Sequence, residues 1–181
     1  NHSASHKPAK RAGSMLIRGA AITYIDLFRG LPALLVIVLL YVSLPFTSIP
    51  LLNTMGAVSV GILSLALVYS AYLAEILRAG IESIDRGQIE AARSLGMSSG
   101  QTTRKIILPQ AIRRVMPPLM NEFIILSKDT ALVSTIAVNE LLGSARNAQS
   151  ATLNSTPLVA AAIGYLIFTI PLTRLLDRYI A

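Results

Sequence analysis

The sequence predicts an all-α membrane protein, a polytopic bundle of transmembrane helices. Hydrophobic residues make up 53% of the 181 residues and charged residues only 14%, about half of the charged fraction of an average soluble domain. No residue between Arg29 and Glu75 is charged. The formal charge of +7 would suggest a nucleic-acid partner for a soluble protein, but Lys and Arg also accumulate on the cytoplasmic side of membrane proteins.

Four segments are long and apolar enough to be membrane spans. The uncharged stretch after Arg29 is too long for one crossing, because about 20 residues at about 1.5 Å each span the hydrocarbon. Pro50 and Asn53 predict a turn inside it. Residues 1–30 are expected to form a cytoplasmic leader and an approach helix, and 31–181 a transmembrane domain. Its expected spans are about 31–49, 55–77, 115–138 and 156–173.

The positions of the charges predict the orientation of these spans. Four spans place the N-terminal segment, the loop between the second and third spans and the C-terminus on one side. That side carries nearly all of the Lys and Arg, whereas the opposite side has only Arg146. This asymmetry assigns the basic side to the cytoplasm. The net charge is thereby explained without nucleic acid.

The loop at 86–109 predicts two short helices joined by a turn. Residues 88–95 are rich in good helix formers, and Gly96 can take the left-handed conformation that ends a helix. Ser98 and Gln101 form a capping-box pattern, so a second helix is expected to begin there. This charged loop is the segment around which the rest of the chain is organised.

Pro109 closes this loop, and its missing N–H predicts that the second helix stops or kinks there. On its own, the loop has two interpretations. A helix, a Gly turn and a second helix with the basic residues Arg93, Arg104 and Lys105 is typical of a helix-turn-helix DNA reader. An ordinary surface helical hairpin has the same pattern, so the flanking spans have to decide.

Four ionisable residues fall inside or at the ends of the predicted spans: Glu75, Glu122, Lys128 and Asp129. A charge in mid-membrane costs about 3 kcal/mol on insertion scales, so such residues are functional candidates. Glu75 could instead form an ion pair with Arg78, three residues further along the helix. A structural charge cluster between helices is the corresponding alternative for the other three.

No pattern in the chain indicates catalysis or metal binding. The chain has no Cys and only two His, both in the polar segment at the N-terminus, and a two-His set without further ligands is a weak metal site. No Ser-His-Asp set or Gly-rich phosphate loop occurs. We therefore predict no enzyme activity, no metal and no cofactor bound by this chain.

The central loop resembles the signature of the permease subunits of bacterial ABC importers. That pattern is Glu-Ala-Ala, three residues, Gly, nine residues, Ile, any residue and Leu-Pro. The chain matches every interval with Glu90-Ala91-Ala92, Gly96, Ile106 and Leu108-Pro109. Five fixed elements at fixed spacing, in a loop between membrane spans, make the resemblance specific.

The flanks resemble the polar amino-acid branch of that family, the His/Glu/Gln/Arg/opine type. They read Tyr24-Ile-Asp-Leu-Phe-Arg-Gly, Ala71-Tyr-Leu-Ala-Glu-Ile-Leu-Arg, Lys128-Asp-Thr and Asn139-Glu-Leu. Two departures stand out. The family usually has a further span before the first of these segments, and Ala131 occupies a position where it often has Ser.

The resemblance implies the ABC importer permease fold, with a cytoplasmic coupling helix that docks on a separate ATPase. The coupling residues implied are Gly87, Gln88, Glu90, Ala91, Ala92, Arg93, Gly96, Ile106, Leu108 and Pro109. ATP and Mg are expected on the ATPase. The other implied partners are a second permease subunit, identical or different, an extracytoplasmic amino-acid binding protein, the lipid bilayer and an amino-acid substrate.

The function implied is that of a multi-pass permease in the bacterial cytoplasmic membrane, with the hairpin facing the cytoplasm. A carboxylate in the span would pair with the ammonium group of a substrate and Lys128 with its carboxylate, and three acids against one base favour a cationic amino acid. Two alternatives stay open. An ATP-independent channel or secondary carrier would share the buried charges, and a membrane-tethered helix-turn-helix protein would use the hairpin on DNA.

Overall fold

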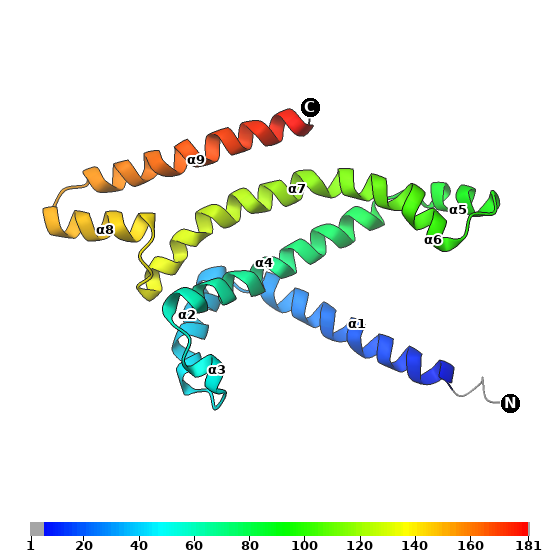
Figure 1. The fold of residues 1–181 in the computed structure, drawn as a ribbon, viewed down its shortest axis with the longest axis horizontal. Coiled ribbons are helices and arrows are strands. Elements are labelled where there is room, and N and C mark those ends of the chain that lie inside the picture. Colours follow the sequence, from blue (N-terminus) through cyan, green and yellow to red (C-terminus); the bar gives the residue numbers. More distant parts are fainter. Residues whose placement is uncertain (1–5, 181) are drawn as a thin grey trace.

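The computed structural model describes the backbone of residues 6–180 and the side chains of residues 15–178, and within that range the chain consists of helices and short connections (Figure 1). Two long helices, α4 (Ala57–Glu82) and α7 (Leu108–Asp129), lie side by side. Helix α1 (His6–Gly30) leaves this pair at an angle, and α9 (Thr156–Ile180) packs on the other side of α7. The predicted all-α class is confirmed.

The first predicted span, 31–49, is not one straight helix. Helix α2 (Ala33–Ser43) has 11 residues, or about 16 Å at 1.5 Å per residue, and is followed by a 3₁₀ turn, η1 (Leu44–Phe46), and the short α3 (Pro50–Asn53). The α1 segment and the α2–η1 segment meet at a bend of 104°. Pro32 explains the bend, because its backbone is extended and it cannot continue the hydrogen-bonding of α1. We call residues 31–33 the α1–α2 corner.

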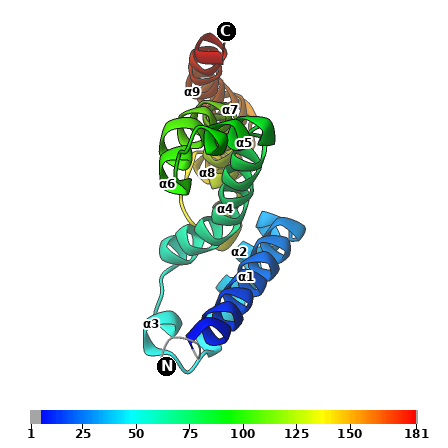
Figure 2. The same cartoon turned by 90° about the vertical axis from the view of Figure 1, so that its right-hand side faces the viewer.

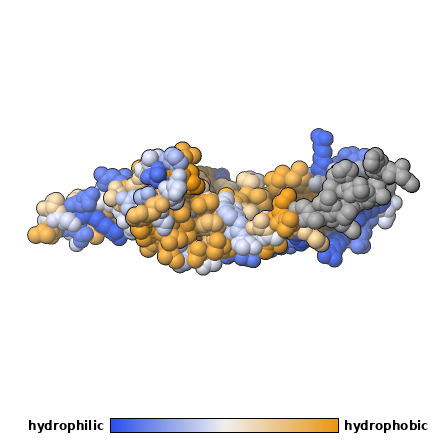
Figure 3. Space-filling model, turned by 90° about the horizontal axis from the view of Figure 1, so that it is seen from below, coloured by the Kyte–Doolittle hydropathy of each residue, from blue (hydrophilic) through white to orange (hydrophobic). Residues whose placement is uncertain are grey.

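Length and composition single out α4 and α9 as helices able to cross a membrane, and the bent α1–α2 pair would be a third if it is one span. Helix α7 falls outside this set because charged residues interrupt its apolar sequence. The predicted span 115–138 is divided between α7 and the 3₁₀ helix η3 (Thr130–Ile136). Apolar side chains nevertheless gather over the middle of the face seen from below, with hydrophilic ones toward its right-hand end (Figure 3).

The core lies where α2, α4 and η3 meet. Its most buried side chains include Ile37, Val60 and Val68. Viewed from the end, α1 and α2 lie to one side of the stack formed by α4, α7 and α9 (Figure 2). Two glycines of α4 permit the close approach of its neighbours. A Cβ at Gly61 would lie 2.9 Å from Val133 Cγ1, and one at Gly80 would lie 2.0 Å from Val115 Cγ1.

The contact at Gly80 yields a stability prediction. Gly80→Ala is expected to destabilise the protein by about 1–3 kcal/mol, as overpacking does, because the new methyl group overlaps a γ-methyl group of Val115. Val115→Ala removes that group, so the double variant should recover thermal stability relative to Gly80→Ala. Thermal unfolding in detergent measures both. A double variant no more stable than Gly80→Ala would contradict this account of the contact.

A further helix occupies part of the segment 139–157, which the sequence suggested only as a polar connection. Helix α8 (Leu141–Thr152) begins at Glu140, whose carboxylate accepts hydrogen bonds from the N–H groups of Leu142 and Gly143 at 2.8 and 2.5 Å. The Tyr165 hydroxyl on α9 donates to the same carboxylate at 3.0 Å. Glu140 therefore joins α8 to α9 as well as starting α8.

Candidate coupling hairpin and transport site

The predicted hairpin forms at one end of the α4–α7 pair. Helix α5 (Arg86–Ser94) starts at Asp85, whose carboxylate accepts a hydrogen bond from the Gly87 N–H at 2.7 Å. Its end is a Schellman motif, in which the Met97 N–H reaches the Ala92 carbonyl at 3.1 Å and the Gly96 N–H reaches the Arg93 carbonyl at 2.9 Å. Gly96 has φ +80. The left-handed turn predicted there is confirmed.

The second helix of the hairpin also begins as predicted. Helix α6 (Ser99–Thr102) has the full capping box, with the Gln101 N–H donating to Ser98 Oγ and the Ser98 N–H donating to Gln101 Oε1. These reciprocal bonds satisfy N–H groups that would otherwise be orphans at a helix start. Ser98 therefore fixes the direction in which the chain leaves the Gly96 turn.

The second helix does not stop at Pro109. Of the two outcomes predicted there, a stop or a kink, the stop is therefore wrong. A π-helical segment, η2 (Thr103–Ile107), connects α6 to α7, and Pro109 is the second residue of α7. The Leu108 N–H bonds to the Thr103 carbonyl, five residues back. The wider π turn accommodates a residue that has no N–H, so the hairpin continues directly into α7.

The implied coupling residues lie mainly on the exposed surface of the hairpin. Glu90, Arg93 and Leu108 are exposed, whereas Ala92 is only 4% exposed and packs inside. A largely apolar hollow of about 340 Å³ lies between α5 and the start of α7, lined by Gln88, Ala91, Ala92, Leu95, Met97, Lys105, Ile106, Pro109 and Gln110. Leu95, at its rim, is 84% exposed. The hairpin thus presents apolar surface outside the apolar middle of the molecule.

Two polar contacts stabilise this end of the molecule, one between the hairpin and α7 and one between α7 and α4. Gln110 Nε2 on α7 donates to Gln88 Oε1 on α5 at 2.6 Å. The Arg114 guanidinium donates to the Ser83 carbonyl at the end of α4. Together they hold α5 and both long helices as one unit at this end of the molecule.

A second site lies at the α1–α2 corner, where Glu122 and Asp129 line a hollow of about 270 Å³. The Tyr69 hydroxyl on α4 donates to Asp129 Oδ2 at 2.8 Å. The rings of Tyr69 and Tyr72 have centroids 6.1 Å apart and line the same hollow. The sequence-based list omitted both tyrosines. The signal that could have identified them is their separation by three residues within a predicted span.

The other two candidates for the substrate pathway lie elsewhere. Glu75 forms the alternative ion pair with Arg78, whose Nε donates to Glu75 Oε2 at 2.9 Å, and lines a different hollow. Lys128 is exposed and does not line the hollow that contains Glu122 and Asp129. The structure therefore brings together two of the four residues, and adds two aromatic rings to them.

A helical membrane protein with a hollow that holds two carboxylates, and a rigid hairpin at one end, has the features of a solute-transport component. Residues 12–180 match the family described as the binding-protein-dependent transport system inner membrane component. The chain belongs to this family.

Two relatives and one solved structure specify the branch. The chain is 41% identical over 157 residues to the probable amino-acid permease protein YxeN of Bacillus subtilis, covering 86% of this chain and 70% of that protein. It is 46% identical over 129 residues to the probable glutamine ABC transporter permease protein GlnP of Bacillus subtilis, covering 70% of this chain and 57% of that protein.

The solved structure is the crystal structure of an amino acid ABC transporter with histidines. It is 38% identical to the chain and has a TM-score of 0.80, covering 98% of this chain and 78% of its own. The predictions of an ABC importer permease fold and of the amino-acid permease family are confirmed.

Proposed function

We propose that this chain forms the translocation path of an ATP-driven amino-acid importer in the bacterial cytoplasmic membrane, and that it couples to a separate ATPase through residues 86–109. The observation that carries the proposal is the pairing of a capped, exposed hairpin with a carboxylate-lined hollow, connected by α4 and α7. A channel or secondary carrier needs the hollow but has no use for the hairpin.

The hairpin can transmit motion because its attachments leave it little freedom. Helix α5 is capped at both ends, and η2 continues without a break into α7. The Gln88–Gln110 contact joins α5 to α7, and the Arg114–Ser83 contact joins α7 to α4. A rigid-body displacement of α5 by closing ATPases would therefore move both long helices together. ATP and Mg belong to the ATPase in this proposal, and the chain itself hydrolyses nothing.

The hollow at the α1–α2 corner suits a positively charged group. Glu122 and Asp129 supply carboxylates, and Tyr69 and Tyr72 supply ring faces that attract cations. The α-ammonium group of an amino acid fits this set, and so does a cationic side chain. Of the residues predicted for the substrate pathway, only Glu122 and Asp129 line this hollow, because Lys128 lies outside it.

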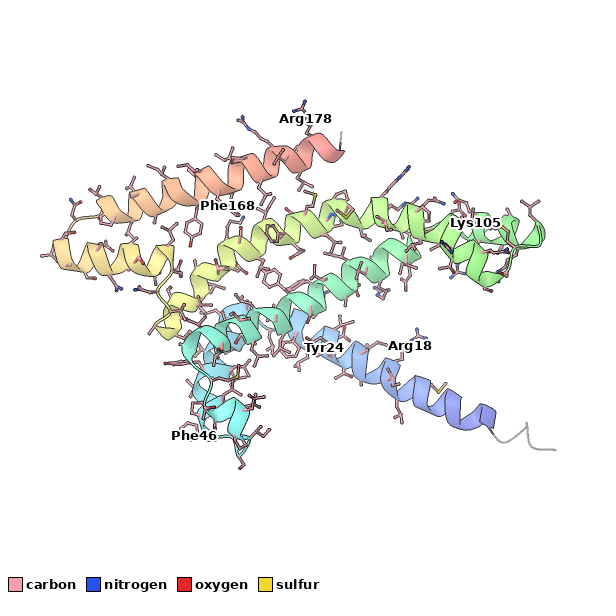
Figure 4. The ribbon with its side chains drawn as sticks, in the orientation of Figure 1. Arg18, Tyr24, Phe46, Lys105, Phe168 and Arg178 are labelled. Atoms are coloured by element: carbon pink, nitrogen blue, oxygen red, sulfur yellow. The ribbon has the colours of Figure 1, made fainter. Side chains whose placement is uncertain are left out.

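The proposed orientation places the hairpin in the cytoplasm. Figure 4 supports it, because Arg18 and Lys105 lie in the half of the molecule that holds the hairpin, while the apolar Phe46 lies in the other half. Basic residues accumulate on the cytoplasmic side of membrane proteins. A second permease subunit and an extracytoplasmic amino-acid binding protein complete the proposed assembly.

Co-purification and transport test this function. The chain, expressed with its membrane partners, is expected to retain an ATPase subunit on affinity purification. Proteoliposomes holding the complex and its binding protein should then accumulate members of an amino-acid panel only when ATP is supplied. Accumulation without ATP would favour a channel or carrier. Salt-sensitive DNA binding by the purified chain would favour the DNA-binding alternative.

A further inference from the structure

A larger hollow lies between α1 and α4, next to the one that contains Asp129. Its volume is about 440 Å³, against about 270 Å³ for the first. Apolar side chains of α1 form part of its wall. Three basic and three acidic side chains also line it, namely Arg18, Arg29, Arg78, Asp26, Glu75 and Glu82. The hollow therefore combines balanced charges of both signs with an apolar surface.

The charges in this hollow are unequally paired. Arg78 is well satisfied, because its guanidinium donates to both carboxylate oxygens of Glu75 and to Glu82 on its own helix, which leaves the remaining lone pairs of the Glu75 oxygens for a further donor. Arg29 on α1 has only a loose ion pair, with Nη1 3.5 Å from Glu75 Oε1, which is longer than a normal hydrogen bond. Among the described side chains, no hydrogen bond to the Arg29 guanidinium is formed. Its donors are available to a ligand.

Arg29 and Glu75 together match the charged groups of an α-amino acid. A guanidinium binds a carboxylate through two parallel hydrogen bonds, and a carboxylate accepts from an ammonium group. The two side chains are 40% and 22% exposed, so both are accessible from the hollow. Ala21, Ile22 and Ile25 of α1 offer an apolar wall for a substrate side chain.

The two hollows follow one another along α4. Tyr69 and Tyr72 line the first, and Glu75 lines the second. These residues follow one another at intervals of three, a rise of about 4.5 Å per step. Tyr24 holds α1 against α4 near this point, because its hydroxyl donates to the Leu67 carbonyl at 2.9 Å. Figure 4 shows Arg18 nearer the N-terminus of α1 than Tyr24, where α1 and α4 have diverged.

We propose that the hollow between α1 and α4 is a second amino-acid site, in series with the first and nearer the coupling hairpin. Arg29 binds the α-carboxylate and Glu75 binds the α-ammonium group. Without ligand, Arg29 and Glu75 form the loose ion pair, and the bound amino acid takes the place of that contact. The inference rests on the proposed function, and it gives Glu75 a place in the pathway distinct from that of Glu122 and Asp129.

Binding stoichiometry tests the second site. The nucleotide-free transporter in nanodiscs is saturated with the radiolabelled amino acid that the uptake panel identifies, with L-arginine and L-glutamine as the first probes. Wild type is expected to bind two molecules per permease chain. Arg29→Gln, Glu75→Gln and Asp129→Asn are each expected to bind one, and Arg113→Gln, an exposed arginine of α7 outside both hollows, to bind two.

Two further measurements keep the test independent of folding. The C-terminal amide of the same amino acid lacks the carboxylate and should fill only the first site of wild type. Arg29→Lys keeps the charge but loses the paired hydrogen bonds, so its second site should weaken about tenfold. A wild type that binds one molecule, or an Arg29→Gln variant that binds two, overturns the inference. Absence of ATP-driven uptake of every amino acid contradicts the proposed function instead.

Discussion

Gly96→Val is expected to reduce ATP-dependent uptake at least about tenfold while the protein still reaches the membrane. Gly96 has φ +80, which a β-branched residue adopts only at a cost of about 1–3 kcal/mol. A Cβ at Gly96 would meet no atom within 4 Å, so the cost comes from the backbone alone. The Schellman turn would open, and α5 would lose its fixed angle to α7.

The matched control is Gly100→Ala, because Gly100 also has open space at its Cβ position but lies inside α6 without a positive φ. It should keep normal uptake. Gly96→Asn should retain more uptake than Gly96→Val, since Asn tolerates the left-handed conformation. Uptake in proteoliposomes and the amount of ATPase that co-purifies are the two measurements. Normal coupling in Gly96→Val would remove the proposed role of the turn.

A charge change on the same helix addresses the contact itself. Glu90→Lys alters an exposed side chain of α5 without changing its caps. We expect the variant to remain in the membrane, to lose uptake and to retain less ATPase on purification, because the change acts on the proposed docking surface. Full retention of the ATPase together with normal uptake would place the contact elsewhere.

Asp129→Asn is expected to lower amino-acid uptake about tenfold to a hundredfold while ATPase co-purification stays normal. The change preserves shape and removes the charge, and hydrogen bonds to charged groups contribute about 1.5–3 kcal/mol. Tyr69→Phe removes only the 2.8 Å hydrogen bond to Asp129 and should cost uptake about fivefold, in keeping with a bond of about 1 kcal/mol. Initial uptake rates over a range of substrate concentrations measure both variants.

Two results would contradict this assignment. Unchanged substrate dependence in Asp129→Asn would show that its carboxylate does not meet the substrate. Equal losses in Asp129→Asn and Tyr69→Phe would indicate that the pair serves the structure of the hollow, since removing the charge should then add nothing to removing the hydrogen bond.

Local signals made the hairpin predictable from the sequence. The Gly96 turn and the Ser98 capping box each depend on residues within one turn of helix, so their pattern appears directly in the chain. The existence of apolar spans followed from composition in the same way. The π segment before Pro109 did not, because a missing N–H can be accommodated either by ending a helix or by widening one turn.

The transport hollow shows where sequence reasoning ends. Tyr69 and Asp129 are 60 residues apart and meet only because α4 packs beside α7. The sequence placed Glu122 and Asp129 in the same predicted span but gave no means of locating their partners. Helix α8 was missed because its mixed composition resembles a connection, and because its N-cap is Glu140 rather than the more usual Ser, Thr, Asp or Asn.

The two close glycine contacts of α4 determine how the molecule can deform. Gly61 meets Val133 near the start of the helix and Gly80 meets Val115 near its finish, so α4 is pinned at both extremities to the rod formed by α7 and η3. A helix packed at both ends against the same partner is expected to move with that partner as one body. Any bending is then expected at the α1–α2 corner, where Pro32 already turns the chain by 104° and lines the cavity beside Asp129.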